Sequence, residues 1–571
     1  MKKIIPMLVA IILILIVGGV YLGPEIREHY SYSKEKADLK EYFGVRGKDD
    51  VPVIMDHEMI EEHARLIDEY CYMKAEDIDA LLNGRFYIGK ADNALIYTTP
   101  EDVITAEIGS GKWSSTDGRS GEEKYKIALY EDDTLFICLD YVRRFTDFSS
   151  DLYTDPNRLV IATSWENEER TRITRKTAVR VRGGIKSEIL CEVNKNAAVR
   201  VVEEMDTWSK IQTDDGFSGY VENKRLGDTV EYTPDHVSDV KEQEYTSISK
   251  PYMINMAWHL ILGKDGNSTL TELIAATDAG EKNGFNTIAP TWFQLCDGEG
   301  NIENNASSEY VKEAHAAGLE VWGVVDNFNN ENADTASSLA TRENRQRLID
   351  HLVEVSLEIG TDGINVDFEQ VPVSSGEDFV EFIRELSIPC RKNSLVLSVD
   401  NYVPMGALND HYDRKEQGVV ADYCVVMGYD EHYKGSEEAG SVASIDFVDN
   451  GIRRTVADVP PEKVIGGMPF YTRVWATKDN TVDSDALSMK KAKEWVEERG
   501  VTLTWNDETC QNYGEITDGD GTLRQIWMED AESISTKIAV MRGYGIAGVA
   551  AWQLGFETPD IWDVIRTSLT N

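Results

Sequence analysis

Residues 360–370, which read Gly-Thr-Asp-Gly-Ile-Asn-Val-Asp-Phe-Glu-Gln, carry two acids two positions apart, Asp367 and Glu369. The alternation of apolar and polar residues predicts a β-strand with one apolar face and one face that bears Asn365 and both acids. Alternation normally indicates one wet face and one buried face, and unpaired carboxylates are costly to bury. We therefore expect the acidic face to belong to a site that handles protons, rather than to a solvated edge strand.

Strands and helices alternate from residue 251 onward, and they predict the elements that hold these acids. The eight predicted strands cover residues 252–258, 287–293, 319–326, 360–370, 394–400, 422–430, 463–470 and 546–553. Eight such strand–helix units predict an α/β fold, a (β/α)8 TIM barrel over residues 251–571. The interval 471–544 is too long for one helix, so it predicts a small α+β insertion.

Acidic and aromatic residues gather where these strands are predicted to end, which is where a barrel of this kind places its active site. They are Trp258, Trp292, Asp326, Asp367, Glu369, Asp400, Tyr429, Asp430, Phe470, Tyr471 and Trp552. Aromatic rings stack on the faces of sugar rings, and carboxylates bind hydroxyl groups and transfer protons. Each aromatic residue alone is more often a core residue, but their coincidence at the strand ends favours a sugar site.

Three of these segments carry a family resemblance. Residues 362–369 resemble the Asp-Gly-x-Asp-x-Asp-x-Glu signature of glycoside hydrolase family 18, the chitinase-like family. Residues 427–430 resemble its Met-x-Tyr-Asp motif, and residues 551–553 resemble the segment of its eighth-strand Trp. The resemblance implies a retaining glycoside hydrolase that cleaves β-linked N-acetylglucosamine glycans by substrate-assisted catalysis, an exception to the scheme with two carboxylates.

By this resemblance, the catalytic residues are Glu369, Asp367 and Tyr429. Glu369 would protonate the leaving oxygen and later activate water, Asp367 would hold the acetamido N–H, and Tyr429 would bind the acetamido carbonyl. The residues expected to bind substrate are Trp552, Asp430, Asn365, Trp292 and Tyr471. No metal and no cofactor are expected.

Asn365 departs from the usual family pattern, which has Asp at this position. An Asp there can share a proton with the residue at the position of Asp367, whereas Asn cannot ionise. The departure is expected to affect the pH optimum and the rate. It does not indicate an inactive relative, because those typically lose the acid at the position of Glu369.

The N-terminal segment is basic at Lys2 and Lys3 and then apolar to about Leu22, which predicts a membrane anchor over residues 1–24, or alternatively a signal peptide. The two lysines predict that the N-terminus lies inside the cell. We therefore expect a single-pass membrane protein with an extracellular catalytic domain, and a secreted protein as the alternative.

Residues 25–168 predict a small α+β module, with helices over 59–72 and 73–82. Its segment 135–163 resembles the copper-amine-oxidase N-terminal-like module of bacterial envelope proteins, which is not known to carry copper. Short strands over residues 169–230, ending in Gly-x-x-Gly-Tyr-Val, resemble the bacterial SH3-like domain, a small β-barrel. That resemblance implies contact with the cell wall, and the alternative is a domain that only positions the barrel. Residues 231–250 predict a linker.

The 571 residues include 58 Lys and Arg against 101 Asp and Glu, a net charge of −43, which disfavours nucleic acid as a partner. Seven scattered cysteines without a Cys-x-x-Cys pair indicate neither a metal site nor a dense disulfide framework. The combined modules resemble membrane-anchored or spore-associated wall hydrolases of Gram-positive bacteria. A non-catalytic glycan-binding protein of the cell wall is the alternative. The choice between peptidoglycan, chitin and N-glycans, and between endo and exo action, stays open.

Overall fold

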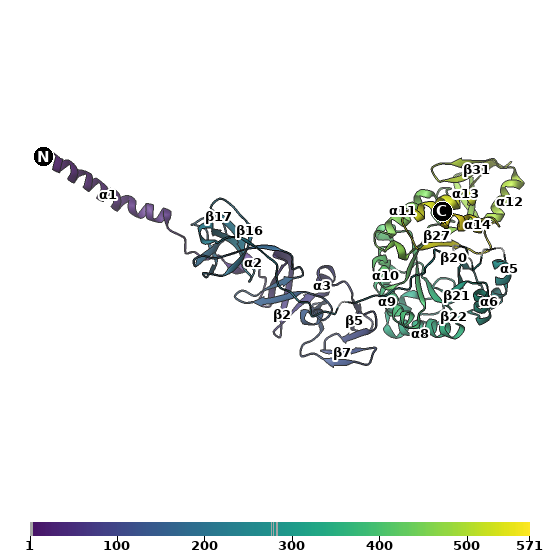
Figure 1. The fold of residues 1–571 in the computed structure, drawn as a ribbon, viewed down its shortest axis with the longest axis horizontal. Coiled ribbons are helices and arrows are strands. Elements are labelled where there is room, and N and C mark those ends of the chain that lie inside the picture. Colours follow the sequence, from purple (N-terminus) through teal and green to yellow (C-terminus); the bar gives the residue numbers. More distant parts are fainter. Residues whose placement is uncertain (1–3, 242, 276, 278, 281–283, 571) are drawn as a thin grey trace. The chain divides into compact units, whose positions relative to one another are not determined.

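The computed structural model describes residues 4–241, 243–275, 277, 279–280 and 284–570. The chain forms two compact units (Figure 1). One comprises residues up to 86 together with 106–112 and 121–242, and the other comprises 87–105, 113–120 and 243–571. The second unit contains the predicted barrel, and it is described first.

Eight parallel strands form the barrel. They are β20 (Ile254–His259), β21 (Thr287–Leu295), β23 (Glu320–Asp326), β24 (Gly363–Asp367), β25 (Val396–Tyr402), β26 (Tyr423–Met427), β27 (Val464–Pro469) and β33 (Gly548–Trp552). Each strand pairs with the next, and β20 pairs with both β21 and β33, so the ring is closed. The short strand β22 (Ile302–Asn304) adds antiparallel to β21. The predicted (β/α)8 fold and its eight strands are confirmed.

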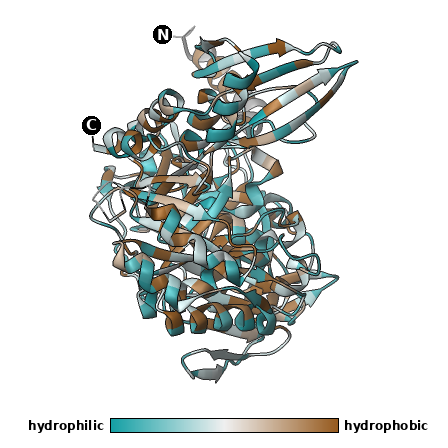
Figure 2. Cartoon of the chain, turned by 90° about the vertical axis from the view of Figure 1, so that its right-hand side faces the viewer, coloured by the Kyte–Doolittle hydropathy of each residue, from teal (hydrophilic) through white to brown (hydrophobic). Residues whose placement is uncertain are grey.

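Helices surround the barrel: α5 (Leu270–Ile274), α6 (Ser308–Ala316), α7 (Thr335–Ala340), α8 (Arg342–Ile359), α9 (Gly376–Asn393), α10 (Arg414–Val420), α11 (Ile445–Thr455), α13 (Ala531–Gly543) and α14 (Ile561–Thr570). Helix α8 begins after Thr341, whose hydroxyl accepts the backbone N–H of Asn344. It ends at Gly360, whose φ of 78° favours glycine, and the chain turns there toward β24. Figure 2 shows the mixture of hydrophobic and hydrophilic residues expected of helices with one face against a sheet.

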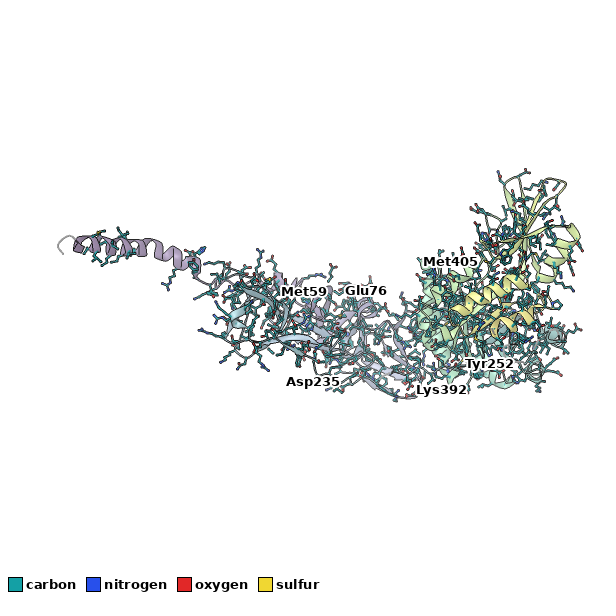
Figure 3. The ribbon with its side chains drawn as sticks, turned by 45° about the horizontal axis from the view of Figure 1, so that its top comes forward. Met59, Glu76, Asp235, Tyr252, Lys392 and Met405 are labelled. Atoms are coloured by element: carbon teal, nitrogen blue, oxygen red, sulfur yellow. The ribbon has the colours of Figure 1, made fainter. Side chains whose placement is uncertain are left out.

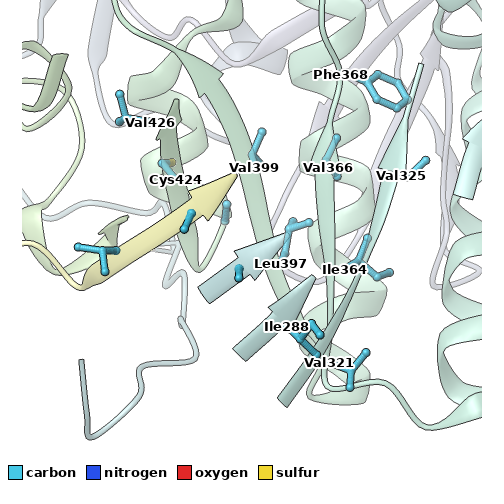
Figure 4. Packing of buried hydrophobic residues seen from close by; sticks show 14 of the residues in the cluster. Ile288, Val321, Val325, Ile364, Val366, Phe368, Leu397, Val399, Cys424 and Val426 are labelled. Carbon is cyan, nitrogen blue, oxygen red and sulfur yellow. The ribbon is translucent and has the colours of Figure 1, made fainter. Parts of the chain in front are cut away.

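The core of the barrel has two layers. Ile364, Val366 and Phe368 point outward and pack between the strands and the helices (Figure 4). Inward-pointing residues such as Trp322 and Val425 fill the interior. The polar face of β24 points into the barrel and every residue of the strand is buried, so β24 is not a solvated edge strand.

The interval after β27 holds the predicted insertion. Its five antiparallel strands are β28 (Tyr471–Lys478), β29 (Thr481–Ser488), β30 (Leu503–Asn506), β31 (Gln511–Thr517) and β32 (Leu523–Trp527), and they pair in the order β29-β28-β32-β31-β30. Helix α12 (Met489–Arg499) packs on this sheet through Ala492 and Val496. The predicted α+β insertion is confirmed, and its first strand begins at a predicted site residue, Tyr471.

A segment far before residue 251 also belongs to the barrel unit. It lies in a sheet of β4 (Phe86–Gly89), β5 (Ala94–Thr98), β6 (Val103–Glu107), β7 (Lys112–Ser115) and β8 (Ser120–Glu122). The Tyr87 hydroxyl donates to Asp378 on α9 (2.6 Å) and accepts from Arg345 on α8 (3.2 Å). Thr98 donates to the buried carboxylate of Glu381. Residues 87–105 are therefore packed on α8 and α9 as part of the barrel unit.

The other unit begins with a seven-stranded sheet in the order β11-β12-β1-β2-β3-β10-β9. Its strands are β1 (Asp50–Met55), β2 (Glu58–Ile67), β3 (Tyr70–Lys74), β9 (Ala128–Glu131), β10 (Thr134–Cys138), β11 (Ser149–Tyr153) and β12 (Arg158–Ala162), with helices α2 (Leu39–Phe43), α3 (Ala75–Leu81) and α4 (Leu139–Val142). The helix predicted over 59–72 is wrong. Asp68 and Glu69 adopt positive φ and turn the chain, so β2 and β3 form a hairpin instead, with Met59 at its start (Figure 3). The second predicted helix is present as α3.

The SH3-like domain follows, with strands β13 (Glu168–Arg172), β14 (Thr177–Arg180), β15 (Ile189–Val193), β16 (Ala198–Glu203), β17 (Trp208–Gln212), β18 (Ser218–Glu222) and β19 (Val230–Tyr232). They pair antiparallel around a core that includes Val179, Ile211 and Val221. A Cβ at Gly219 would lie 2.6 Å from the Arg180 carbonyl oxygen. This close approach explains the second glycine of Gly-x-x-Gly-Tyr-Val.

The N-terminal helix α1 spans Ile4–Tyr30. A membrane crossing needs about 20 consecutive apolar residues. Among the described residues, no helix combines the length and the apolar character that a crossing requires. The prediction of a membrane anchor over residues 1–24, and with it the single-pass membrane localisation, is therefore wrong. The predicted orientation rested on Lys2 and Lys3, which lie outside the described residues. Residue 242 of the predicted linker also lies outside them.

Candidate active site

Three aspartates lie side by side at the carboxyl ends of adjacent barrel strands. Asp326 ends β23 and pairs in register with Asp367, which ends β24. Val366 pairs with Val399, so the next residues in register are Asp367 and Asp400 of β25. Their exposed fractions are 1%, 6% and 2%, and all three face the barrel interior. The fold thus concentrates three carboxyl groups in the buried interior of the barrel.

Burial of these carboxyl groups makes their ionised forms unfavourable. Burial is the largest cause that raises the pKa of Asp367 well above its usual range, and the charges of Asp400 and Glu369 add to it. Burial also raises the pKa of Asp400, to about 8. The cluster therefore retains at least one proton at neutral pH.

Glu369 follows β24 by two residues, and its backbone is held on both sides by one amide. Its N–H donates to Asn327 Oδ1, and Asn327 Nδ2 donates to its carbonyl oxygen, both at 2.8 Å. The Tyr402 hydroxyl donates to Glu369 Oε2 at 2.7 Å. Burial raises the pKa of Glu369, the Tyr402 hydrogen bond opposes this, and Asp430 raises it further. The arrangement fixes a carboxyl group that can carry a proton to a ligand and take one back.

Asn365 precedes Asp367 by two residues on the same face of β24 and is completely buried. Trp258 donates its indole N–H to Asn365 Oδ1 at 3.0 Å, and Asn365 Nδ2 donates to Asp400 Oδ1 at 2.8 Å. These bonds define the orientation of the amide. Asn365 is therefore placed beneath the aspartates as a bridge between Trp258 and Asp400.

Most of the aromatic residues predicted for the site surround the acids. Tyr429 follows β26, and its ring meets Trp258 edge to face at 6.4 Å and Tyr471 at 6.3 Å. The Tyr471 hydroxyl donates to Asp430 Oδ1 at 2.5 Å. The Trp552 ring lies 6.1 Å from that of Trp258. Burial, followed by the charge of a neighbouring aspartate, raises the pKa of Tyr429, so its hydroxyl keeps its proton and can donate it in a hydrogen bond.

Trp292 does not join this group. Its indole N–H donates to Asn267 Oδ1 at 2.8 Å, and its ring packs edge to face on Tyr310 at 5.1 Å. It is fully buried in the layer between strands and helices. The pairing of β21 with β23 shifts register between Thr291 and Phe293, so the alternation of faces that the sequence suggests breaks at this residue.

Two residues at the site were not predicted from the sequence. Tyr402 lies on β25 two residues beyond Asp400, so it faces the same side. Extending the predicted strand from residue 400 to 402 would have found it. Asn327 follows Asp326 directly in a loop, and nothing in the sequence pattern indicates its hydrogen bonds to Glu369.

Large hydrophobic side chains are exposed in the loops that follow five of the barrel strands. They are Leu262, Phe328, Val373, Met405, Leu408 and Tyr433, and Figure 3 marks Met405. Clusters of exposed apolar side chains at one end of a molecule indicate a contact surface. These loops follow β20, β23, β24, β25 and β26, so the surface extends around the same end of the barrel as the acids.

A closed barrel with a buried acid cluster and surrounding aromatic rings at its strand ends is the arrangement expected of a sugar-processing enzyme, a glycosidase. Residues 326–557 match the family Glycosyl hydrolases family 18, and residues 176–227 match Bacterial SH3 domain. The barrel therefore matches a glycosidase domain of family 18, and the segment before it in the chain matches a bacterial SH3 domain.

Known relatives agree with this. The chain is 27% identical over 294 residues to the uncharacterized glycosylase YvbX of Bacillus subtilis, covering 49% of this chain and 84% of YvbX. It is 25% identical over 260 residues to the cortical fragment-lytic enzyme of Bacillus anthracis, covering 43% of this chain and 59% of that enzyme. The C-terminal domain of a Desulfitobacterium hafniense DCB-2 protein superposes with a TM-score of 0.51 at 20% identity, over 56% of this chain and 99% of that domain. This last likeness concerns the fold alone.

Proposed function

We propose that this protein is a retaining glycoside hydrolase that cleaves β-linked, N-acetylglucosamine-containing glycans with the substrate's own acetamido group as nucleophile. The observation that carries the proposal is the placement of Glu369. Asn327 and Tyr402 fix it next to the protonated aspartate row and near Tyr429. Burial raises the pKa of Glu369, which favours the protonated form that a general acid needs.

The first chemical step breaks the glycosidic bond. Glu369 gives its proton to the leaving oxygen while the acetamido oxygen attacks the anomeric carbon, so that bond breaks and an oxazolinium ion forms. Asp367 accepts a hydrogen bond from the acetamido N–H and stabilises the positive charge that develops. Tyr429 donates its hydroxyl to the acetamido oxygen and aims it.

The second step opens the oxazolinium ring. A water molecule gives a proton to the Glu369 carboxylate and attacks the anomeric carbon on the face that the leaving group vacated. Two successive inversions give net retention. Trp552 and Tyr471 would contact the sugar ring, and Asp430 would orient Tyr471 through their hydrogen bond.

Peptidoglycan is the proposed polymer. The SH3 domain and a relative named for lysis of cortical fragments support it. The spread of exposed apolar side chains over five loops suits a ligand longer than one sugar. Mass spectrometry of digested wall glycans and chitooligosaccharides would identify the bond cleaved. The alternative function, glycan binding without turnover, predicts binding to the same polymers with no release of reducing ends.

A substrate without N-acetyl groups should resist the enzyme. The proposed nucleophile is the acetamido oxygen, so de-N-acetylated chitooligosaccharide should be cleaved at least about 100-fold more slowly than the acetylated chain of equal length, a loss in the range expected when a positioned reacting group is removed. Release of reducing ends measures the difference. Equal rates on the two substrates would contradict the acetamido mechanism.

Replacing Tyr402 by Phe should move the pH profile of cleavage toward higher pH. The lost hydrogen bond stabilises the ionised form of Glu369, so without it the pKa of Glu369 rises further. The protonated acid then persists to higher pH, and the basic limb of kcat/KM shifts upward. Tyr130→Phe, which alters an exposed tyrosine of β9 in the other unit, is the control and should leave the profile unchanged. A basic limb that moves down or stays in place would refute this role of Tyr402.

A further inference from the structure

Two carboxylate oxygens in the aspartate row lack a partner. Asp367 Oδ1 and Asp400 Oδ2 are shielded from solvent, and among the described residues neither accepts a hydrogen bond. A buried polar atom left unsatisfied costs about 1–3 kcal/mol, and more if charged. Two such oxygens on neighbouring strands therefore call for a common explanation.

The strand geometry brings the two carboxyl groups together. Asp367 and Asp400 follow directly on the paired residues Val366 and Val399, and both face the barrel interior. Paired strands lie about 4.8 Å apart, so facing carboxyl groups on them can meet through one hydrogen atom. Asn365 binds the other oxygen of Asp400, Oδ1, at 2.8 Å, which leaves Oδ2 as the oxygen able to meet Asp367.

The groups around this pair give no other neutralising charge. Asp326 on β23 is bound by the N–H groups of Phe328 and Asn329. Glu369 is bound by Tyr402, and Asp430 by Tyr471. Tyr429 and Trp258 contribute rings and neutral donors. Among the described residues, no Lys or Arg forms an ion pair with Asp367 or Asp400, and one shared proton would satisfy both oxygens without a cation.

We propose that Asp400 is a positioning residue that holds one proton in common with Asp367, and so performs the proton sharing that Asn365 cannot perform. The inference rests on the proposed function and deepens it. In the resting site one proton lies between Asp367 and Asp400. When the acetamido N–H donates to Asp367, the proton stays on Asp400, and Asp367 faces the oxazolinium ion as an anion. The proton returns to the shared position when product leaves, so the step balances. The pKa of Asp400, raised to about 8 by burial, agrees with a proton retained at neutral pH.

The test begins with Asp400→Asn in the full chain. Its amide can donate permanently to Asp367 but cannot exchange a proton, so kcat on chitooligosaccharide should fall about 10- to 100-fold, the size seen for supporting partners, with KM within about threefold. The ionisation near pH 8 should disappear from the pH profile, because the variant has no shared proton to lose. Asp410→Asn, an exposed position in the loop after the same strand, is the matched control and should change neither quantity.

The double variant Asn365→Asp/Asp400→Asn returns a carboxyl group to the neighbourhood of Asp367 on its own strand. It should recover about tenfold or more of the lost kcat and restore an ionisation, a non-additivity expected of coupled residues. Unchanged kcat and pH profile in Asp400→Asn, or no recovery in the double variant, would overturn the inference. Infrared spectra offer a readout that needs no turnover: the band of a protonated carboxyl group at neutral pH should weaken in Asp400→Asn, and its persistence at full strength would also overturn it. A wild-type chain that cleaves nothing would instead refute the proposed function.

Discussion

Glu369→Gln should leave an intact protein that binds glycan and cleaves it about 10³-fold more slowly or worse, within the range that a general acid and base contributes. Gln cannot give the proton to the leaving oxygen or take one from water. The fold should tolerate the change, because Gln can still accept the Tyr402 hydrogen bond and the backbone contacts to Asn327 do not involve the side chain. Release of reducing ends measures the rate, and titration calorimetry with an uncleaved oligosaccharide measures binding.

Glu438→Gln is the matched control for this experiment. Glu438 is an exposed glutamate in the loop after β26, at the same end of the barrel, so its replacement should alter the rate less than about twofold, as for a surface position away from the chemistry. Equal activity of Glu369→Gln and wild type would remove the basis for the proposed mechanism. Tight binding by a wild-type chain that shows no turnover would instead favour the glycan-binding alternative.

Arg345→Met should destabilise the protein by about 3–5 kcal/mol, the cost of breaking a buried ion pair from one side. Arg345 on α8 is completely buried, and it donates to Glu385 Oε1 at 2.9 Å and to the Leu339 carbonyl oxygen at 2.8 Å. Its loss leaves the Glu385 carboxylate buried without its cation. Arg347→Met on the same helix is the control, because Arg347 pairs at the surface with Glu343. A surface pair contributes about 0–1 kcal/mol.

The loss of stability in Arg345→Met should depend on pH in a defined direction. Burial already raises the pKa of Glu385 to about 7, and removing Arg345, which lowers it, raises the pKa further. A carboxyl group with a raised pKa in the folded state binds protons there that the unfolded chain releases, so the penalty grows as pH rises above the pKa of the unfolded state. Denaturant unfolding at about pH 5 and about pH 8 should show the larger loss at about pH 8. A deficit equal to that of Arg347→Met at both values would contradict this account.

Sequence pattern predicted the barrel well, because hydrophobic strands alternating with helices leave few other folds. It also located the acids, since a polar face on a strand within a barrel points to the interior. The prediction failed where the pairing of strands overrides the local hydrophobic pattern. The register shift in β21 moves Trp292 out of the site, and the turn at Asp68 converts a predicted helix into a hairpin.

The sequence pattern also did not predict that charged residues of a helix are buried. Glu381, Arg384 and Glu385 of α9 are buried, although a charged stretch of helix normally lies in solvent. Their burial depends on partners distant in sequence, among them Thr98 and Glu416. Proton sharing between Asp367 and Asp400 is likewise a property of two neighbouring strands. No spacing within either segment could have revealed it.

The packing of residues 87–105 on α8 and α9 bears on how such a chain can be rearranged in evolution. An N-terminal module that merely preceded the barrel could be exchanged among wall enzymes by recombination at the linker. Here a recombination point between residues 106 and 242 would separate Tyr87 and Thr98 from helices α8 and α9. The buried charged residues of these helices would then lose their hydrogen-bond partners. We infer that this stretch and the barrel are inherited together, and that matching changes at Tyr87 and Arg345 should appear in the same lineages.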